Sequence, residues 1–385
     1  MDMIDFLFDY ATLRVIWWAL LGVLLVGFAV TDGFDLGVGA LLPFVARNDL
    51  ERRIAINTVG PVWEGNQVWF VLGGGAIFAA WPALYALSFS GFYLAMFLVL
   101  AALILRPVGF KYRSKRPDPA WRERWDWALF TGGAVPALVF GVAVGNALRG
   151  VPFHFTTDLR PIYEGTLFGL LNPVALYCGL VSLAMLVMHG AAWLSFKAEG
   201  PVATRARAFG TMAALATAAL FAGGGFLAWS GLLGGYRVTS AVSFGGPSNP
   251  LLKTVVAEPG AWLANYAAHP WLWVVPGLGI AGALLAAAGF RTRAEGLTFL
   301  CSKLAVAMIV TTAGVSLFPF LLPSSTHPEM SLTVFDASSS RSTLRNMLIA
   351  TVIFMPLILG YTAWVYRVLW GKVGAKDITG GGHAY

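Results

Sequence analysis

Three carboxylates lie in or beside strongly apolar segments near the start of the chain. Asp32 and Asp35 belong to "AVTDGFDLGVG", and Glu64 belongs to "GPVWEGNQVWF". An ionised side chain at the centre of a membrane costs about 2.5–3.5 kcal/mol, so such residues are functional candidates. A carboxyl group in low-dielectric surroundings can hold a proton at neutral pH and pass it on. These residues therefore predict proton transfer.

The spacing of the carboxylates predicts that they lie close together. Asp32 and Asp35 are three residues apart, so they share one face of a helix. Glu64 falls at about the same membrane depth as Asp32 and Asp35 if the first two membrane spans are antiparallel neighbours. Asn66 and Gln67 add uncharged polar groups beside it. The group resembles a hydrated proton path that opens to the cytoplasm.

A second interpretation is purely structural, and the residues alone do not separate the two. In this interpretation the three carboxylates pair with Arg52, Arg53 or Arg106 and only hold helices together. Arg106 ends the third predicted span, where it could pair with Asp35 or Asp126. It could also anchor the helix by extending its charged head to the membrane surface.

The chain has few residues that could bind a metal or a heme. Its two cysteines, Cys178 and Cys301, lie in apolar runs without a CxxC spacing, and no zinc or phosphate-binding motif appears. A membrane b-type heme needs two axial ligands, but only His189 lies well inside a predicted span. The other histidines lie at span ends, in loops or in the tail: His154, His269, His327 and His383. The sequence predicts that this chain alone binds no heme, other cofactor or metal.

Composition places the whole chain in a membrane. Of its 385 residues, 58% are hydrophobic and 12% are charged, whereas soluble proteins carry about 25% charged residues. A span needs about 20 apolar residues. We predict an all-α polytopic membrane protein, one domain over residues 1–385, with nine transmembrane helices. They lie near 13–33, 60–80, 83–105, 127–148, 168–194, 208–230, 270–289, 299–321 and 346–369.

The distribution of Lys and Arg predicts the orientation. Most of them fall in alternate connections and in the C-terminal tail, as in "KYRSKRPDPAWRER" (111–124). Cytoplasmic loops carry this excess, so we expect a periplasmic N-terminus and a cytoplasmic C-terminus. The basic run is expected to face anionic lipid headgroups, and no role in nucleic-acid binding is expected.

Several long motifs resemble one family. They include "GFAVTDGFDLGVG", "RNDLERRIAINTVGPVWEGNQVWF", "LRPVGFKYRSK" and "FPFLLPSSTHPEMSLTVFDASSS", spread over nearly the whole chain. Together they resemble subunit II of the cytochrome bd quinol oxidases. The resemblance implies a respiratory terminal oxidase of the bacterial cytoplasmic (inner) membrane that oxidises ubiquinol or menaquinol and reduces dioxygen to water.

The resemblance also implies partners and cofactors. Subunit II pairs with subunit I as a heterodimer, often with small single-span accessory subunits. Subunit I carries two b-type hemes, heme d and the quinol site. The complex builds proton motive force without pumping, because the protons consumed come from the cytoplasm and quinol protons leave on the other side.

The resemblance assigns a proton path between the two subunits to the carboxylates of subunit II. Residue by residue, these are Asp35, with Asp32 beside it, and Glu64. Some family members have Asp at the position of Glu64, so the carboxylate here is one methylene longer. Some members also hold a lipid or quinone as a structural element in the region of Trp63. The residues expected to support the path are Trp63, Asn66, Gln67 and Arg106.

Two other classes of function compete with proton delivery. A pure scaffold would stabilise subunit I and shield its hemes, with structural carboxylates. A secondary transporter would use an intramembrane carboxylate pair, and such transporters often contain repeated halves. The sequence shows no strong internal repeat, and the family resemblance argues against a transporter.

Overall fold

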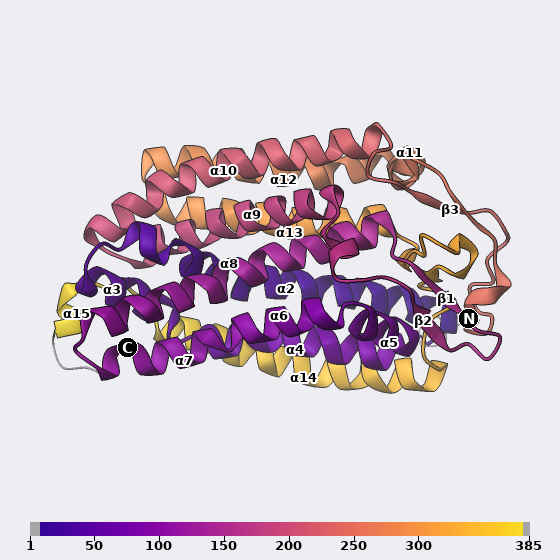
Figure 1. Cartoon of the computed structure of the whole chain (residues 1–385), viewed down its shortest axis with the longest axis horizontal. Coiled ribbons are helices and arrows are strands. Elements are labelled where there is room, and N and C mark those ends of the chain that lie inside the picture. Colours follow the sequence, from indigo (N-terminus) through magenta and orange to yellow (C-terminus); the bar gives the residue numbers. More distant parts are fainter. Residues whose placement is uncertain (1–7, 380–385) are drawn as a thin grey trace.

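Long helices run side by side along one axis in the computed structural model, which describes residues 8–379 (Figure 1). Helices suit this apolar chain because they satisfy their backbone hydrogen bonds internally where no water is available. Eight helical segments of the described chain are long and apolar enough to cross a membrane. The long helices are α2 (Tyr10–Val45), α8 (Pro119–Arg149), α9 (Pro173–Lys197), α10 (Gly200–Trp229), α12 (Val274–Thr292), α13 (Glu295–Leu317) and α14 (Arg341–Val368).

The second and third predicted spans look different in the structure. The second corresponds to α4 (Trp63–Ala80), whose polar first turn makes it less apolar than the eight candidates. The third is divided into α5 (Pro82–Gly91), α6 (Tyr93–Leu103) and α7 (Leu105–Tyr112). The other seven predicted spans overlap long helices.

Small residues let α2 lie close to two neighbouring helices, as expected between membrane helices. A side-chain carbon added at Gly37 would clash with the backbone oxygen of Leu186 on α9. One added at Gly133 on α8 would clash with the backbone oxygen of Leu36. Any larger side chain at these two glycines would push the helices apart. This packing fixes the positions of the α2 side chains.

The two ends of the bundle have different structures (Figure 1). We call one the α3 end, because it holds the short helices α3 (Asp49–Val59) and α15 (Ala375–Thr379). We call the other the hairpin end, because it holds three two-stranded antiparallel sheets. The pairs are β1 (Phe153–Phe155) with β2 (Pro161–Tyr163), β3 (Tyr236–Val238) with β4 (Val255–Ala257), and β5 (Phe320–Leu322) with β6 (Leu332–Thr333). The described chain begins at the hairpin end and finishes at the α3 end.

Candidate functional site

Asp32 forms a buried, two-pronged ion pair with Arg106. The exposed fractions of Asp32 and Arg106 are 0% and 2%. Arg106 lies on α7 and donates from Nη2 to Oδ1 at 2.6 Å and from Nη1 to Oδ2 at 3.0 Å. Bidentate pairs of this kind are strong and geometrically specific. Both oxygens of Asp32 are therefore occupied by one guanidinium.

Asp35 lies on the same face of α2, as its spacing predicted, but its contacts are weaker. Asn66 on α4 donates from Nδ2 to Oδ2 of Asp35 at 2.8 Å. The hydroxyl of Tyr366 on α14 donates to Oδ1 of Asn66 at 2.7 Å. Nη2 of Arg106 is 3.9 Å from Oδ2 of Asp35, and within the described chain Oδ1 of Asp35 has no hydrogen-bond partner. A polar row thus connects α14, α4 and α2 and ends on Asp35.

The charges of this group do not balance. We call Asp32, Asp35 and Arg106 the interior cluster: it holds two carboxyl groups and one guanidinium, and all three residues are buried. An uncompensated buried charge costs several kcal/mol. A proton on one carboxyl group would restore the balance, and Asp35 has the free oxygen to carry it. Its charge imbalance and the unpartnered oxygen of Asp35 make the interior cluster a candidate proton site.

A small cavity adjoins the interior cluster. It has a volume of about 10 Å³, between Asp35, Arg106 and apolar side chains that include Ile56 and Val59 of α3. That is about the room needed for one water molecule. The cavity lies on the side of Asp35 toward α3.

The structure places Glu64 apart from the two aspartates. Glu64 lies in the first turn of α4 and is exposed on the surface of the chain. Its depth matches the expectation, because Asn66 two residues later contacts Asp35. The expected grouping with Asp32 does not occur, because residues i and i+2 of a helix do not share a face. Gln67 is half-buried on the same helix.

Trp63 packs inside the chain next to the interior cluster. Its ring centroid is 5.8 Å from the guanidinium carbon of Arg106 and 5.6 Å from the ring of Phe110. Its Nε1 is buried and has no hydrogen-bond partner among residues 8–379. The ring forms one wall beside Arg106.

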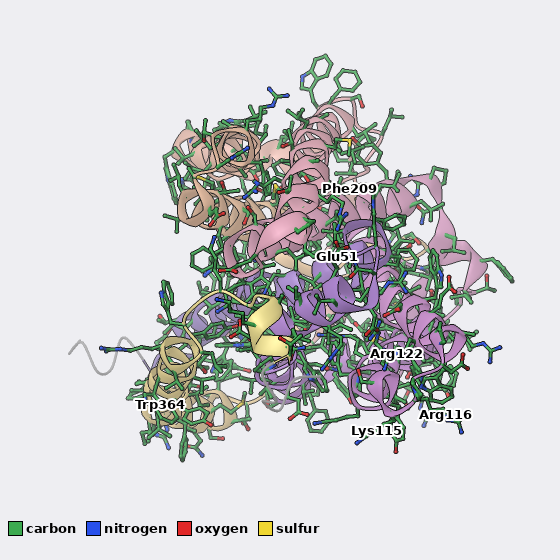
Figure 2. The ribbon with its side chains drawn as sticks, turned by 90° about the vertical axis from the view of Figure 1, so that its left-hand side faces the viewer. Glu51, Lys115, Arg116, Arg122, Phe209 and Trp364 are labelled. Carbon is green, nitrogen blue, oxygen red and sulfur yellow. The ribbon has the colours of Figure 1, made fainter. Side chains whose placement is uncertain are left out.

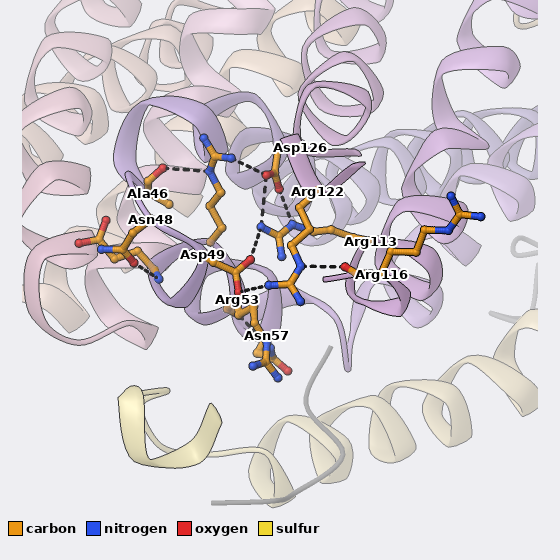
Figure 3. Close-up of polar contacts among 11 residues, drawn as sticks. Ala46, Asn48, Asp49, Arg53, Asn57, Arg113, Arg116, Arg122 and Asp126 are labelled. Atoms are coloured by element: carbon orange, nitrogen blue, oxygen red, sulfur yellow. Dashed lines mark hydrogen bonds and ion pairs between the residues drawn. The ribbon is translucent and has the colours of Figure 1, made fainter. Parts of the chain in front are cut away.

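A second group of carboxylates and arginines lies at the α3 end (Figure 3). Asp126 contacts Arg52 at 2.6 Å and Arg113 at 2.5 Å. Asp49 contacts Arg113 at 3.0 Å and Arg122 at 2.8 Å. We call these five residues the α3-end network. The pairing of Asp126 with Arg106, one of the sequence alternatives, is therefore wrong.

The α3 end also carries charged residues at its surface, where Lys115 and Arg116 are exposed and Glu51 and Arg122 are half-buried. Figure 2 looks onto this end, where Glu51, Lys115, Arg116 and Arg122 are visible. Arg116 and Arg122 belong to the basic run 111–124, which was expected as a connection but is helical at both ends, because α7 reaches Tyr112 and α8 begins at Pro119. Arg122 donates to the backbone oxygen of Arg116 at 3.0 Å. Positive charge thus gathers at one end of the bundle.

His189, which lies inside a predicted span, makes polar contacts between helices. Its Nε2 donates to the backbone oxygen of Val30 at 2.9 Å, and its Nδ1 lies 2.8 Å from Oγ of Ser302. The residue is fully buried. Both ring nitrogens are engaged within the bundle, so neither points outward toward a ligand.

Comparison with known proteins identifies the family. Residues 13–369 match the model of the family described as cytochrome bd terminal oxidase subunit II. A probable cytochrome oxidase subunit 2 of Haemophilus influenzae is 51% identical over 376 residues, 98% of this chain and 99% of that protein. The cytochrome bd-I ubiquinol oxidase subunit 2 of Escherichia coli (strain K12) is 50% identical with the same coverage. This chain belongs to the cytochrome bd terminal oxidase subunit II family.

More distant relatives agree with this assignment. The cytochrome bd ubiquinol oxidase subunit 2 of Bacillus subtilis is 32% identical, over 95% of this chain and 98% of that protein. A chain of the solved bd oxidase from Geobacillus thermodenitrificans is similar in fold, with a TM-score of 0.64 at 14% identity, over 94% of this chain and 98% of that chain. The subunit II chain is therefore a multi-pass protein of the bacterial inner membrane.

Sequence reasoning missed one member of the polar row in this subunit II chain. Tyr366 lies near the end of the last predicted span, where an aromatic residue is ordinarily interpreted as a membrane-surface anchor. Its hydroxyl instead contacts Asn66, 300 residues earlier in the chain. No local pattern connects two positions so far apart.

Proposed function

We propose that this chain is the heme-free subunit of a quinol:oxygen oxidoreductase, paired with a subunit I that carries two b-type hemes, heme d and the quinol site. Family membership supports the pairing. The observation that supports a heme-free role is that both nitrogens of His189, the one histidine deep in the described bundle, are hydrogen-bonded to neighbouring helices. The complex then generates proton motive force without pumping, with lipid and small single-span subunits around it.

We further propose nine membrane crossings, with the N-terminus periplasmic and the C-terminus cytoplasmic. Eight candidate spans and α4 make up the nine. An odd number of crossings fits the beginning and end of the described chain, which lie at opposite ends of the bundle (Figure 1). The arginines of the α3 end belong on the cytoplasmic side according to the positive-inside rule.

The proton path is proposed to have two stations in this chain. The inner station is Asp35, because it has one unpartnered oxygen and shares a single guanidinium with Asp32. The adjoining cavity would hold the water that connects Asp35 with the α3 end. Asp32 acts as the anchor, because Arg106 occupies both of its oxygens. Asn66 and Tyr366 orient Asp35.

The outer station is Glu64, on the surface that faces subunit I. The exposed side chains that follow it along α4 are apolar, including Val68 at 57%, Val71 at 69% and Phe78 at 59% exposed. A carboxylate on such a face is costly against lipid, so contact with a partner subunit is favoured. The neighbouring helix α14 is also exposed over most of its length, with Leu344 as its buried residue.

A scaffold role is the second candidate, and the Asp32–Arg106 pair favours it for that residue. Buried ion pairs hold helices in register even where no proton moves. The two candidates differ in what Glu64 does, because an exposed residue contributes little to the packing of this chain. Glu64 is therefore the residue to test first.

The test is quinol-driven oxygen uptake by the purified complex with Glu64→Gln, with heme spectra recorded on the same sample. We expect low turnover with intact spectra, and recovery of turnover in Glu64→Asp, which keeps the carboxyl group. Glu123→Gln, which changes an exposed glutamate near the start of α8, is the matched control and should keep normal turnover. Normal turnover in Glu64→Gln would remove Glu64 from the path, and joint loss of hemes and turnover would favour the scaffold.

A further inference from the structure

Two histidines and a glutamate meet at the hairpin end of the bundle. His154 lies on β1, Glu164 follows directly after β2, and His327 lies between β5 and β6. One ligand atom from each of the three residues lies within 4.8 Å of the others. None of these residues takes part in the proposed proton path, and no sequence motif connects them.

The distances between the donor atoms suit one shared ion. Nδ1 of His154 is 3.0 Å from Oε1 of Glu164. Two donors bound to one zinc ion at tetrahedral angles lie about 3.3 Å apart, given bond lengths of about 2.0–2.1 Å. The imidazole rings of His154 and His327 have their centroids 5.4 Å apart. Rotations of the side chains would bring all three donor atoms within bonding distance of one shared ion.

The backbone that carries these side chains is firmly held. Oγ of Ser324 donates to the backbone oxygen of Phe153 at 2.5 Å and accepts from the backbone N–H of His327 at 3.0 Å. The backbone N–H of Glu164 donates to the oxygen of Pro152 at 3.0 Å. The three ligand positions are thus linked by hydrogen bonds that do not depend on any ion. Such preorganisation lowers the cost of forming a binding site.

A supporting hydroxyl lies between two of the three residues. Oγ1 of Thr326 is 3.2 Å from Oε2 of Glu164 and 3.2 Å from Nδ1 of His327. Metal-binding carboxylates and imidazoles are commonly oriented by such neighbouring groups. A simple ion pair between His154 and Glu164 accounts for neither the place of Thr326 nor that of His327.

We propose that His154, Glu164 and His327 form a binding site for one divalent transition-metal ion of the zinc type, with Thr326 orienting two of the ligands. Imidazole ligands favour zinc, copper and nickel over magnesium and calcium, which prefer oxygen. The side chains of His154 and Glu164 are 30% and 38% exposed, so an ion can enter from solvent. Water would complete the coordination. The bound ion would tie the β1–β2 hairpin to the segment between β5 and β6.

The first experiment measures zinc bound to the purified two-subunit complex. The complex is stripped with a chelator and equilibrated with Zn²⁺, and the zinc retained is compared between wild type and variants. We expect one zinc per complex to be lost in His154→Ala and in His327→Ala. His269→Ala, which removes an exposed histidine outside the cluster, is the matched control and should retain it. Thr326→Val should weaken zinc binding by about tenfold, in line with other supporting-group changes.

All variants should keep wild-type oxygen uptake and heme spectra, which also show that they are folded. Equal zinc retention in wild type and in the double variant His154→Ala/His327→Ala would overturn the proposal. A second measurement needs no variant: zinc-edge X-ray absorption of the loaded wild-type complex should show two imidazole ligands per zinc. A shell of oxygen ligands alone would also overturn the proposal.

Discussion

The interior cluster and the α3-end network are built from the same two residue types with opposite balances. The interior cluster has more carboxylates than guanidinium groups, and the α3-end network has more guanidinium groups than carboxylates. Excess positive charge at the end of a membrane bundle is stabilised by water and lipid headgroups. Excess negative charge inside the bundle has no such support, and a bound proton would relieve it. The balance of charges, rather than the presence of ion pairs, is therefore what distinguishes the proposed proton site from the α3-end network.

The largest expected effect is on stability, and it compares the loss of one arginine from the interior cluster with the loss of one from the α3-end network. Arg106→Met leaves the two buried carboxyl groups without a cation, which should cost about 3–5 kcal/mol. Arg113→Met should cost less, about 1.5–3 kcal/mol, because Asp126 keeps Arg52 and Asp49 keeps its other arginine. Arg106 and Arg113 are equally buried, at 2% exposure, so the pair is matched.

Thermal unfolding of the purified complex, followed by heme absorbance, checks this ranking. The midpoint should fall further for Arg106→Met than for Arg113→Met. The deficit of Arg106→Met should shrink as the pH is lowered, because protonation removes the uncompensated charges. Equal shifts for the two variants would show that the charge balance does not matter.

The next largest effect concerns turnover and separates Asp35 from Asp126. Asp35→Asn keeps the size of the side chain and the Asp32–Arg106 pair, so we expect nearly unchanged stability. If Asp35 carries protons, oxygen uptake should fall at least about tenfold, within the range for removing a proton-transfer group. Asp126→Asn should lower the stability of the complex, because Asp126 pairs with Arg52 and Arg113, but it should leave the turnover per heme normal. Normal turnover in Asp35→Asn would assign the whole interior cluster to structure.

A smaller effect on stability and turnover is expected at Tyr366, the first residue of the polar row that ends on Asp35. Tyr366→Phe removes the hydrogen bond to Asn66 and should cost about 0.5–1.5 kcal/mol. Turnover should fall less than in Asp35→Asn, because Asn66 still contacts Asp35. Tyr361→Phe is the control, since Tyr361 lies on the same helix and is 65% exposed. Identical unfolding midpoints for the two variants would argue against an orienting role for Tyr366.

The smallest effect is a pH dependence at Glu51, outside the membrane-spanning segments. Burial acts to raise the pKa of Glu51, but hydrogen bonds from Arg205 and from the backbone N–H of Arg47 hold this pKa below its usual range. A lowered pKa in the folded state stabilises the protein above the unfolded value, about 4.3. This stabilisation is lost as pH falls through the folded value.

Glu51→Gln tests this dependence. The variant should lower stability by about 0.5–1 kcal/mol at neutral pH. The difference from wild type should disappear at pH values well below about 4, where the wild-type carboxyl group is also uncharged. Unfolding midpoints of both proteins across this range provide the measurement. A difference that stays constant with pH would show that the contribution of Glu51 is not electrostatic.

Much of the fold could be predicted because apolar segments of span length leave few alternatives. The helix that carries Asp32 and Asp35 followed from the local apolar pattern. The break of the third predicted span at Phe92 and Ile104 did not, because an unbroken apolar run does not show where a helix is interrupted.

The candidate site divides in the same way. That Asp32 and Asp35 share a helix face follows from the helical period, and the structure confirms it. The choice of Arg106 for Asp32 was one of several open alternatives, and Asn66 was expected only as a neighbour. The cluster of His154 and His327 was missed entirely, since it is formed by strands whose pairing has no signature in so few residues.

The sequence by itself determined that this chain lies in a membrane, where its carboxylates fall along the helices, and to which family it belongs. Composition and the length of the apolar segments determine the membrane location, and helical periodicity determines where the carboxylates fall. Only the tertiary structure decided that Glu64 points outward while Asp35 points inward. The physical reason is that contacts between helices depend on how each helix is rotated about its axis, and that rotation is set by the packing of all its neighbours at once.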